Sequence, residues 1–222
     1  MASNQWVAIE NEDAGEDDEP EHYWYYFQAN GKALTNGDND KVSFKTINGK
    51  KYAFDDEGKM LYGWVSEDNA ERVDNTDGDG FKEGDYYFGG EDDGAMTTGW
   101  LLMDITYDEA TSDYEIAPAF NDDEDQSRWF YFKSNGKKVY SSSTDETKDK
   151  TINGKKYTFD QYGAMAAEWS LDKAKASSSL GEATVNSVEK TGSNAQYSQS
   201  WRYFNSVEDG SRVSKGLSLI HI

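Results

Sequence analysis

Tryptophan and tyrosine side chains recur along this chain of 222 residues in short aromatic runs. The run Trp24-Tyr25-Tyr26-Phe27 returns 105 residues later as Trp129-Phe130-Tyr131-Phe132. The face of such a ring attracts cations, most strongly in tryptophan, and it can also stack on the C–H face of a sugar. Rings that recur in this way predict a molecule that binds a ligand several times over.

A second segment repeats at the same interval and indicates how the rings are positioned. Residues 46–52 (TINGKKY) return unchanged as residues 151–157. Short strands joined by an Asn-Gly pair are a strong signal for a β-hairpin with a two-residue turn, which needs positive φ. Such pairs occur at Asn30-Gly31, Asn48-Gly49, Asn135-Gly136 and Asn153-Gly154. Six hairpin units are predicted, opening near Trp24, Ile47, Tyr86, Trp129, Ile152 and Trp201.

Repeats of this size cannot bury an apolar face alone, so they stack on their neighbours. The predicted fold class is therefore all-β, a repeat array of β-hairpins that forms a β-solenoid with acidic loop insertions. A phenylalanine holds the fourth aromatic place of every unit, which predicts a packed spine of Phe27, Phe54, Phe88, Phe132, Phe159 and Phe204. The first and third places vary, from Trp24 and Tyr26 to Lys51 and Ala53, so we expect them to face solvent or a ligand.

The spacing of the units divides the chain into hairpin segments and linkers. Hairpins are expected at residues 21–64, 86–100, 129–169 and 201–216, and linkers at residues 65–85, 101–128 and 170–200. The middle linker has two expected strands, 101–107 and 114–120, and each linker either loops out or breaks the stack. Residues 1–20 are expected to be the truncated end of a preceding repeat plus an acidic linker, with Met1 an internal methionine. Residues 217–222 are expected to be a non-native tail.

Composition excludes several classes of function. The formal net charge is −21, concentrated between the units, which disfavours nucleic acid and anionic membrane surfaces as partners. No stretch is long and apolar enough to predict membrane insertion. The chain has no cysteine, and its two histidines, His22 and His221, suggest no nucleophilic triad. We therefore expect no catalytic residue and no cofactor in this sequence, although a catalytic domain outside it stays open.

One acidic segment has part of the spacing of a calcium loop. Asn75, Asp77, Asp79 and Gly80 match the first, third, fifth and sixth positions of such a loop. The twelfth position holds Tyr86, where a calcium loop needs a bidentate glutamate. A solvated acidic turn is the expected structure, and no metal site is predicted.

Together, these motifs resemble a known family. The runs Trp-Tyr-Tyr-Phe, Asn-Gly-Lys and Gly-x-Met-x-x-Gly-Trp (residues 58–64) are similar to the cell-wall-binding, choline-binding type of repeat. The TINGKKY segments are similar to glucan-binding repeats of secreted glucosyltransferases and to carbohydrate-binding repeats of clostridial toxins. The resemblance implies a non-catalytic, extracellular region on the surface of a Gram-positive cell. Its implied partner is a cell-wall polymer, either choline-bearing teichoic acid or a polysaccharide.

The resemblance also implies where a ligand sits. In choline-binding repeats, the tryptophan of one Gly-Trp motif joins aromatic residues of the next hairpin, and the cage holds a quaternary ammonium by cation–π attraction. Carried over here, the ligand-binding residues are Trp6, Trp24 and Tyr26; Trp64 and Tyr87 beside Asp85; Trp100, Trp129 and Tyr131; and Trp169, Trp201 and Tyr203. No cage is expected at the units near Ile47 and Ile152, because lysine stands in their first aromatic place.

Other functions remain open at this point. A wall or glucan saccharide could occupy the same rings, as in the binding region of a toxin-like or glucosyltransferase protein. A purely structural stalk or adhesin segment would use the aromatic residues for stacking alone and would bind no small ligand.

Overall fold

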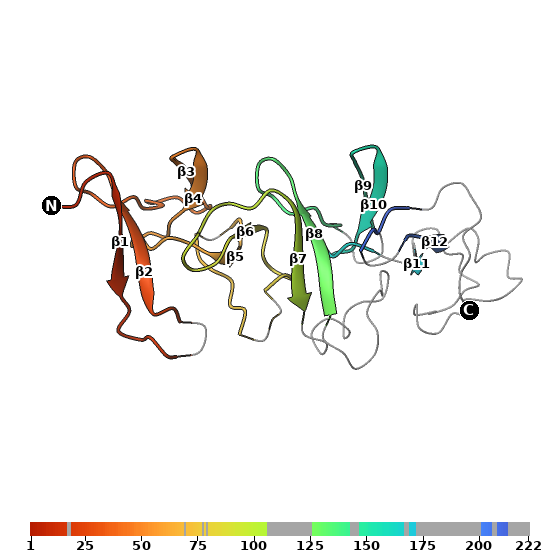
Figure 1. The fold of residues 1–222 in the computed structure, drawn as a ribbon, viewed down its shortest axis with the longest axis horizontal. Coiled ribbons are helices and arrows are strands. Elements are labelled where there is room, and N and C mark those ends of the chain that lie inside the picture. The colour runs from red at the N-terminus through yellow and green to blue at the C-terminus, as the bar shows by residue number, and fades with distance from the viewer. Residues whose placement is uncertain are drawn as a thin grey trace, which may run out of the picture. The chain divides into compact units, whose positions relative to one another are not determined.

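The computed structural model describes residues 1–16, 19–68, 70–76, 78, 80–105, 126–142, 147–166, 169–171, 201–205 and 208–212. This part of the chain holds twelve strands and no helix (Figure 1). The strands are β1 (Gln5–Glu10), β2 (His22–Phe27), β3 (Phe44–Ile47), β4 (Lys50–Ala53), β5 (Gly63–Val65), β6 (Tyr86–Phe88), β7 (Gly99–Ile105), β8 (Gln126–Phe132), β9 (Lys148–Ile152), β10 (Lys155–Phe159), β11 (Trp169–Leu171) and β12 (Trp201–Tyr203). Among the described residues there is no helix with the length and hydropathy that crossing a membrane requires. The all-β prediction is confirmed.

The chain divides into two compact units. Unit 1 comprises Met1–Gly99 and Phe132–Lys138, and unit 2 comprises Trp100–Tyr131 and Val139–Ile222. The strands form two-stranded sheets in chain order, pairing β1 with β2, β3 with β4, β5 with β6, β7 with β8, β9 with β10, and β11 with β12. This order confirms the predicted repeat of β-hairpins.

The Asn-Gly turns are of two kinds. At the tips of β3–β4 and β9–β10, both turn residues have positive φ, 49° for Asn48 and Asn153 and 84° and 81° for the glycines that follow. The two-residue prediction is therefore right at these tips. It is wrong at Asn30 and Asn135, where only the following glycine has positive φ. The Asn30 side chain there accepts a hydrogen bond from the Lys32 N–H at 2.9 Å, so a longer turn closes on the bridge between Phe27 and Ala33.

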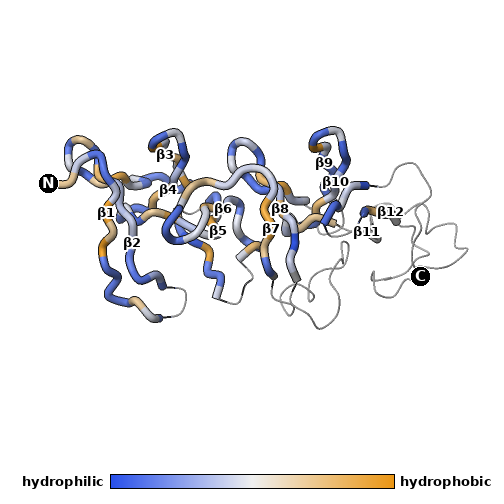
Figure 2. Tube along the Cα trace, viewed as in Figure 1, coloured by the Kyte–Doolittle hydropathy of each residue, from blue (hydrophilic) through white to orange (hydrophobic). Residues whose placement is uncertain are grey.

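The linkers are inserted at hairpin ends and do not separate the strands they join. Trp64 in β5 pairs with Tyr87 in β6, and Trp169 in β11 pairs with Tyr203 in β12. Strand β7 pairs with β8 in the same way, and it covers the first strand expected in the middle linker as far as Ile105, the last described residue of that stretch. The second, at 114–120, lies outside the described residues. Figure 2 shows the corresponding insertion between β1 and β2 as a mostly hydrophilic loop.

The phenylalanine spine forms the core. Five of its six members are at most 1% exposed, namely Phe54, Phe88, Phe132, Phe159 and Phe204. Phe27 near the N-terminus is half-buried. Full burial of such a side chain is worth about 1.5–3 kcal/mol, so each of these five phenylalanines stabilises its unit.

The third aromatic place is not always exposed, contrary to expectation. Ala53 is 0% exposed and Thr158 is 1% exposed. Ala53 packs in a cluster with Val65, Tyr86 and Phe88, so the face of β4 opposite to the spine is covered as well. The Thr158 hydroxyl donates a hydrogen bond to Asp149 at 2.6 Å, which satisfies a buried polar group.

Candidate ligand-binding sites

Three tryptophans, Trp6, Trp64 and Trp100, lie in matching surroundings. Each makes a T-shaped contact with a tyrosine ring at nearly the same centroid distance and interplanar angle: Trp6–Tyr26 at 5.2 Å and 70°, Trp64–Tyr87 at 5.2 Å and 70°, Trp100–Tyr131 at 5.0 Å and 72°. A spine phenylalanine also lies close to each tryptophan, with ring centroids 5.8 Å apart for Phe54, 5.9 Å for Phe132 and 5.9 Å for Phe159. These clusters are called the Trp6, Trp64 and Trp100 sites below.

A β-bridge and a backbone hydrogen bond hold one more residue in place at each site. In each case this residue forms an isolated β-bridge with the spine phenylalanine six positions before it: Met60 with Phe54, Lys138 with Phe132 and Met165 with Phe159. Their N–H groups donate to the backbone carbonyl of the residue at the first aromatic place of an earlier unit: Met60 to Trp24 at 2.8 Å, Lys138 to Asp85 at 2.7 Å, and Met165 to Trp129 at 2.9 Å. The three residues are thus structurally equivalent, and two are methionine while one is lysine.

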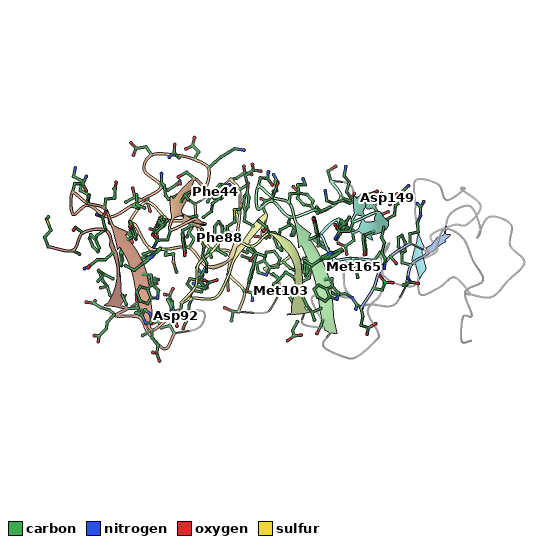
Figure 3. All side chains as sticks on the ribbon, turned by 45° about the horizontal axis from the view of Figure 1, so that its top comes forward. Phe44, Phe88, Asp92, Met103, Asp149 and Met165 are labelled. Carbon is green, nitrogen blue, oxygen red and sulfur yellow. The ribbon has the colours of Figure 1, made fainter. Side chains whose placement is uncertain are left out.

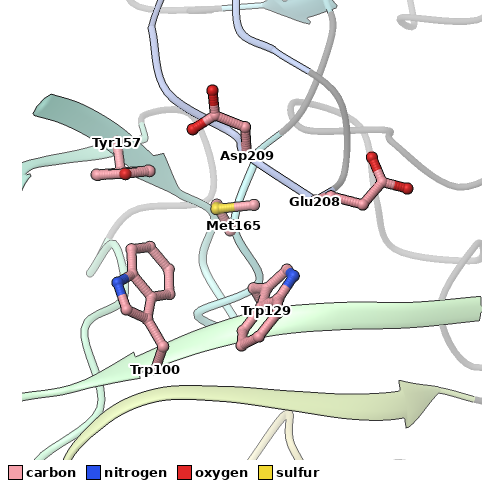
Figure 4. Close-up of a pocket in the computed structure, with 6 residues that line it drawn as sticks. All are labelled: Trp100, Trp129, Tyr157, Met165, Glu208 and Asp209. Atoms are coloured by element: carbon pink, nitrogen blue, oxygen red, sulfur yellow. The ribbon is translucent and has the colours of Figure 1, made fainter.

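The Trp100 site is an open pocket of about 180 Å³, lined by Trp100, Trp129, Tyr157, Met165, Glu208 and Asp209 (Figure 4). The Trp100 ring lies 4.8 Å from Tyr157 and 6.2 Å from Trp129, measured between ring centroids. The pocket is smaller than the ~300–1,000 Å³ that hold drug-sized ligands. It therefore fits a small group with apolar surface, next to two carboxylates.

The Asp209 carboxylate of this pocket is held in the ionised form. Burial acts to raise the pKa of Asp209, but hydrogen bonds from Asn205, Lys155 and Ser211 outweigh it, so this pKa lies below its ordinary value. The Lys155 ammonium lies 3.2 Å from Asp209. The pocket mouth is thus negatively charged at neutral pH, with one cation at its rim.

The Trp6 site in unit 1 has the same kinds of residues around its tryptophan. Trp6 lies 4.9 Å from Tyr52, and Trp24 and Met60 pack in the same cluster. Its acidic residue is Asp92, which accepts a hydrogen bond from the Trp24 indole N–H at 2.9 Å; Figure 3 shows Asp92 beside β2.

Hydrogen bonds favour the ionised form of Asp92. The bond from the Trp24 indole, and then the bond from His22 at 3.1 Å, lower the pKa of Asp92. The next residue, Asp93, lies 3.3 Å from the Lys50 ammonium. This pair matches Asp209 and Lys155 in unit 2.

The Trp64 site is closed. Trp64 is only 2% exposed, and so is Lys138, whose ammonium lies 5.0 Å from the centre of the Trp64 ring. That ammonium donates a hydrogen bond to the carbonyl of Phe81, a buried residue of the acidic linker. The expected carboxylate, Asp85, accepts a hydrogen bond from the Glu67 N–H at 2.9 Å and lies 3.8 Å from the Lys137 ammonium.

The expected ring partners of Trp6, Trp64 and Trp100 are therefore found beside them, while ligand binding itself stays a prediction. In the fourth expected group, the backbones of Leu171 and Trp201 pair, as do those of Trp169 and Tyr203, and these side chains lie outside the description. Sequence reasoning missed Tyr52 and Tyr157, which come from the units where no cage was expected. They hold the second aromatic place, and the TINGKKY repeat was the available signal.

No group of three or more acidic or histidine residues arranged to hold a metal ion occurs in the described ranges. Two residues of the calcium-like segment, Asp77 and Asp79, lie outside those ranges. Within it, Asn75 accepts a hydrogen bond from the Gly80 N–H at 2.9 Å, as in a compact turn.

No family model matches the sequence, and no curated protein does. Among solved structures, CbpF in complex with ipratropium is similar at 20% identity and a TM-score of 0.49, covering 96% of this chain and 43% of that chain. Choline binding protein F from Streptococcus pneumoniae with a peptidoglycan analogue is similar at 18% identity and a TM-score of 0.45, covering 97% and 54%. The modular autolysin LytC from Streptococcus pneumoniae is similar at 20% identity and a TM-score of 0.41, covering 98% and 35%. This chain thus spans about half or less of the length of those proteins.

Proposed function

We propose that this chain is a non-catalytic binding region that attaches an extracellular protein to cell-wall polymer by holding quaternary ammonium groups, of the choline type, in its open aromatic sites. The observation that carries the proposal is the Trp100 pocket, where rings of Trp100, Trp129 and Tyr157 converge beside Glu208 and Asp209. The Trp6 site is proposed to act in the same way.

The pocket chemistry favours a methylated cation over other small groups. A cation near several ring faces gains cation–π attraction, about 0.5–1 kcal/mol at exposed sites and about 2 kcal/mol when desolvated. The methyl groups of a quaternary ammonium need no hydrogen-bond acceptor and suit apolar walls such as Met165. The two carboxylates add attraction from the mouth of the pocket.

Attachment to a polymer follows from having more than one site in the chain. A polymer that carries the same group repeatedly can engage two sites at once, and the second contact is then intramolecular. The resemblance of the repeats to wall-binding sequences supports choline-bearing teichoic acid as that polymer. A wall or glucan saccharide is the second candidate, because Lys155 and Asp209 at the rim could bind hydroxyl groups.

The proposal is tested by titrating the chain with choline while observing the methyl groups of ¹³C-labelled methionines. The expected result is a saturable change in the chemical shifts of the Met60 and Met165 methyl groups, which lie in the Trp6 and Trp100 sites. Met96 is the internal control. It forms the equivalent β-bridge with Phe88, which belongs to none of the three tryptophan sites. Parallel titrations with glucan and muropeptides test the saccharide, and a folded chain silent to every ligand would favour the structural stalk.

A further inference from the structure

We propose that the Trp64 site is a third cation site of the same kind, which the chain occupies permanently with the ammonium group of Lys138. The inference rests on the proposed function only for the choice of external probe. It gives this region a role that the open sites lack, namely holding an acidic linker onto the hairpins.

Position is the first argument. Lys138 makes the same bridge and the same backbone hydrogen bond as Met60 and Met165, so its side chain starts from the place where the open sites have methionine. The neighbouring rings also agree, since Tyr87 and Phe132 lie around Trp64 as Tyr131 and Phe159 lie around Trp100.

The environment of the ammonium is the second argument. A buried ammonium is costly unless it finds compensating partners. Lys138 is 2% exposed, and its ammonium has the Trp64 ring at 5.0 Å and the Phe81 carbonyl as a hydrogen-bond acceptor. A ring face and an acceptor are what a lysine cation needs in a ligand site, so Lys138 is placed as a bound ligand would be.

The linker residues around Trp64 supply the third argument. A β-carbon added to Gly84 would lie 2.6 Å from the Trp64 ring, and one added to Gly80 would lie 3.0 Å from it. Residues 80–84 therefore lie against the indole, with Phe81 2% exposed. Beside them, Lys137 pairs with Glu67 of the same linker. The two lysines thus hold the linker near both of its ends. Lys137 holds Glu67 through an ion pair, and Lys138 holds Phe81 through a hydrogen bond from the aromatic site.

The test is the substitution Lys138→Met, which places the residue of the open sites in the closed one. The ammonium, its hydrogen bond to the Phe81 carbonyl and its position over the Trp64 ring are then lost, so nothing in the chain supplies a cation to that ring. The expected result is one more choline equivalent bound than by the unchanged chain, with a saturable shift of the methyl group introduced at position 138. A folded variant with unchanged stoichiometry and an unmoved methyl would overturn the proposal. Lys137→Met is the control, because it removes the neighbouring charge and leaves Lys138 in place.

A measurement on the unchanged chain covers the case in which the variant does not fold. Brief acylation followed by mass spectrometry should modify Lys50 and Lys155, whose side chains are 62% and 59% exposed, at least tenfold faster than Lys138. Modification of Lys138 at the rate of Lys50 in the folded chain would contradict the proposal. Acylation uses no choline, so its result is independent of whether the open sites bind that ligand.

Discussion

The Trp64 and Trp100 sites have almost the same rings in almost the same geometry, yet one is filled by the chain and the other is a pocket. The tyrosine–tryptophan distances are 5.2 and 5.0 Å, and the phenylalanine lies 5.9 Å from each tryptophan. Three features differ: lysine or methionine at the bridge, aspartate or tryptophan at the first aromatic place, and the linker residues 80–84 that lie against the Trp64 indole. On the proposals above, the same arrangement of rings serves as an internal fastening in one repeat and as a ligand site in another.

Converting the open site into the closed one is expected to have the largest effect. In Met165→Lys, the new ammonium should lie among the rings and pair with Glu208 and Asp209, which line the same pocket. Choline binding at the Trp100 site should be abolished, as measured by loss of one equivalent in calorimetry. Met96→Lys is the matched control, because Met96 makes the equivalent bridge to Phe88 away from any tryptophan site.

Removing one wall of the open pocket should have a smaller effect. In Trp129→Ala, the ligand loses one ring face, worth about 1–2 kcal/mol in a partly desolvated site, so choline affinity measured through the Met165 methyl should fall about 5–30-fold. Trp129→Phe should recover part of that loss. Trp24→Ala removes the corresponding ring in unit 1 and should leave the response of the Met165 methyl to choline unchanged. A weaker Met165 response in that variant would contradict the claim that the two sites bind independently.

The carboxylates should contribute less than the rings. Glu208→Gln should weaken choline binding about 2–5-fold, the effect of a partly exposed charge pair worth about 0.5–1 kcal/mol. The effect should shrink as salt is added, because exposed charges are screened. Glu91→Gln, an exposed acid of unit 1, is the control read at the same methyl group. An equal loss in both variants would mean that net charge, rather than the pocket acids, drives binding.

The smallest effect is expected from lowering the pH toward 4. The pKa of Asp92 is lowered by its hydrogen bonds from Trp24 and His22, and the pKa of Asp209 is lowered despite its burial. Because its pKa is lowered, each carboxylate stays charged at every pH above about 3.9, the ordinary pKa of aspartate. Its attraction for a cation is therefore lost only below that pH. Asp209 should therefore keep its contribution from pH 7 to about pH 4, with the choline affinity measured at the Met165 methyl changing less than about twofold over that range. A steep loss between pH 6 and 5 would contradict this assignment.

Much of the fold could be predicted from sequence because it depends on local patterns. The Asn48-Gly49 and Asn153-Gly154 turns need positive φ, and the spine phenylalanines mark the fourth aromatic place of each unit. The exposure of the third place could not be predicted, because Ala53 and Thr158 are covered by residues outside their own hairpin or bonded across it.

The candidate sites were predicted in part for the same reason. The pairing of Trp6, Trp64 and Trp100 with the next aromatic run follows from the repeat. The roles of Tyr157, Lys138 and Glu208 depend on which later segment reaches back to each tryptophan, and that register is set by tertiary packing. Lys138 stands six residues after a spine phenylalanine, as Met60 and Met165 do, so aligning the units on the spine would have shown the exchange.

The most direct test compares the number of choline equivalents bound by three chains in one calorimetric series: the unchanged chain, Lys138→Met and Met165→Lys. If the residue at the bridge decides whether an aromatic site is open, the first variant binds one equivalent more than the unchanged chain and the second binds one equivalent less. Identical stoichiometry in all three folded chains would contradict that claim.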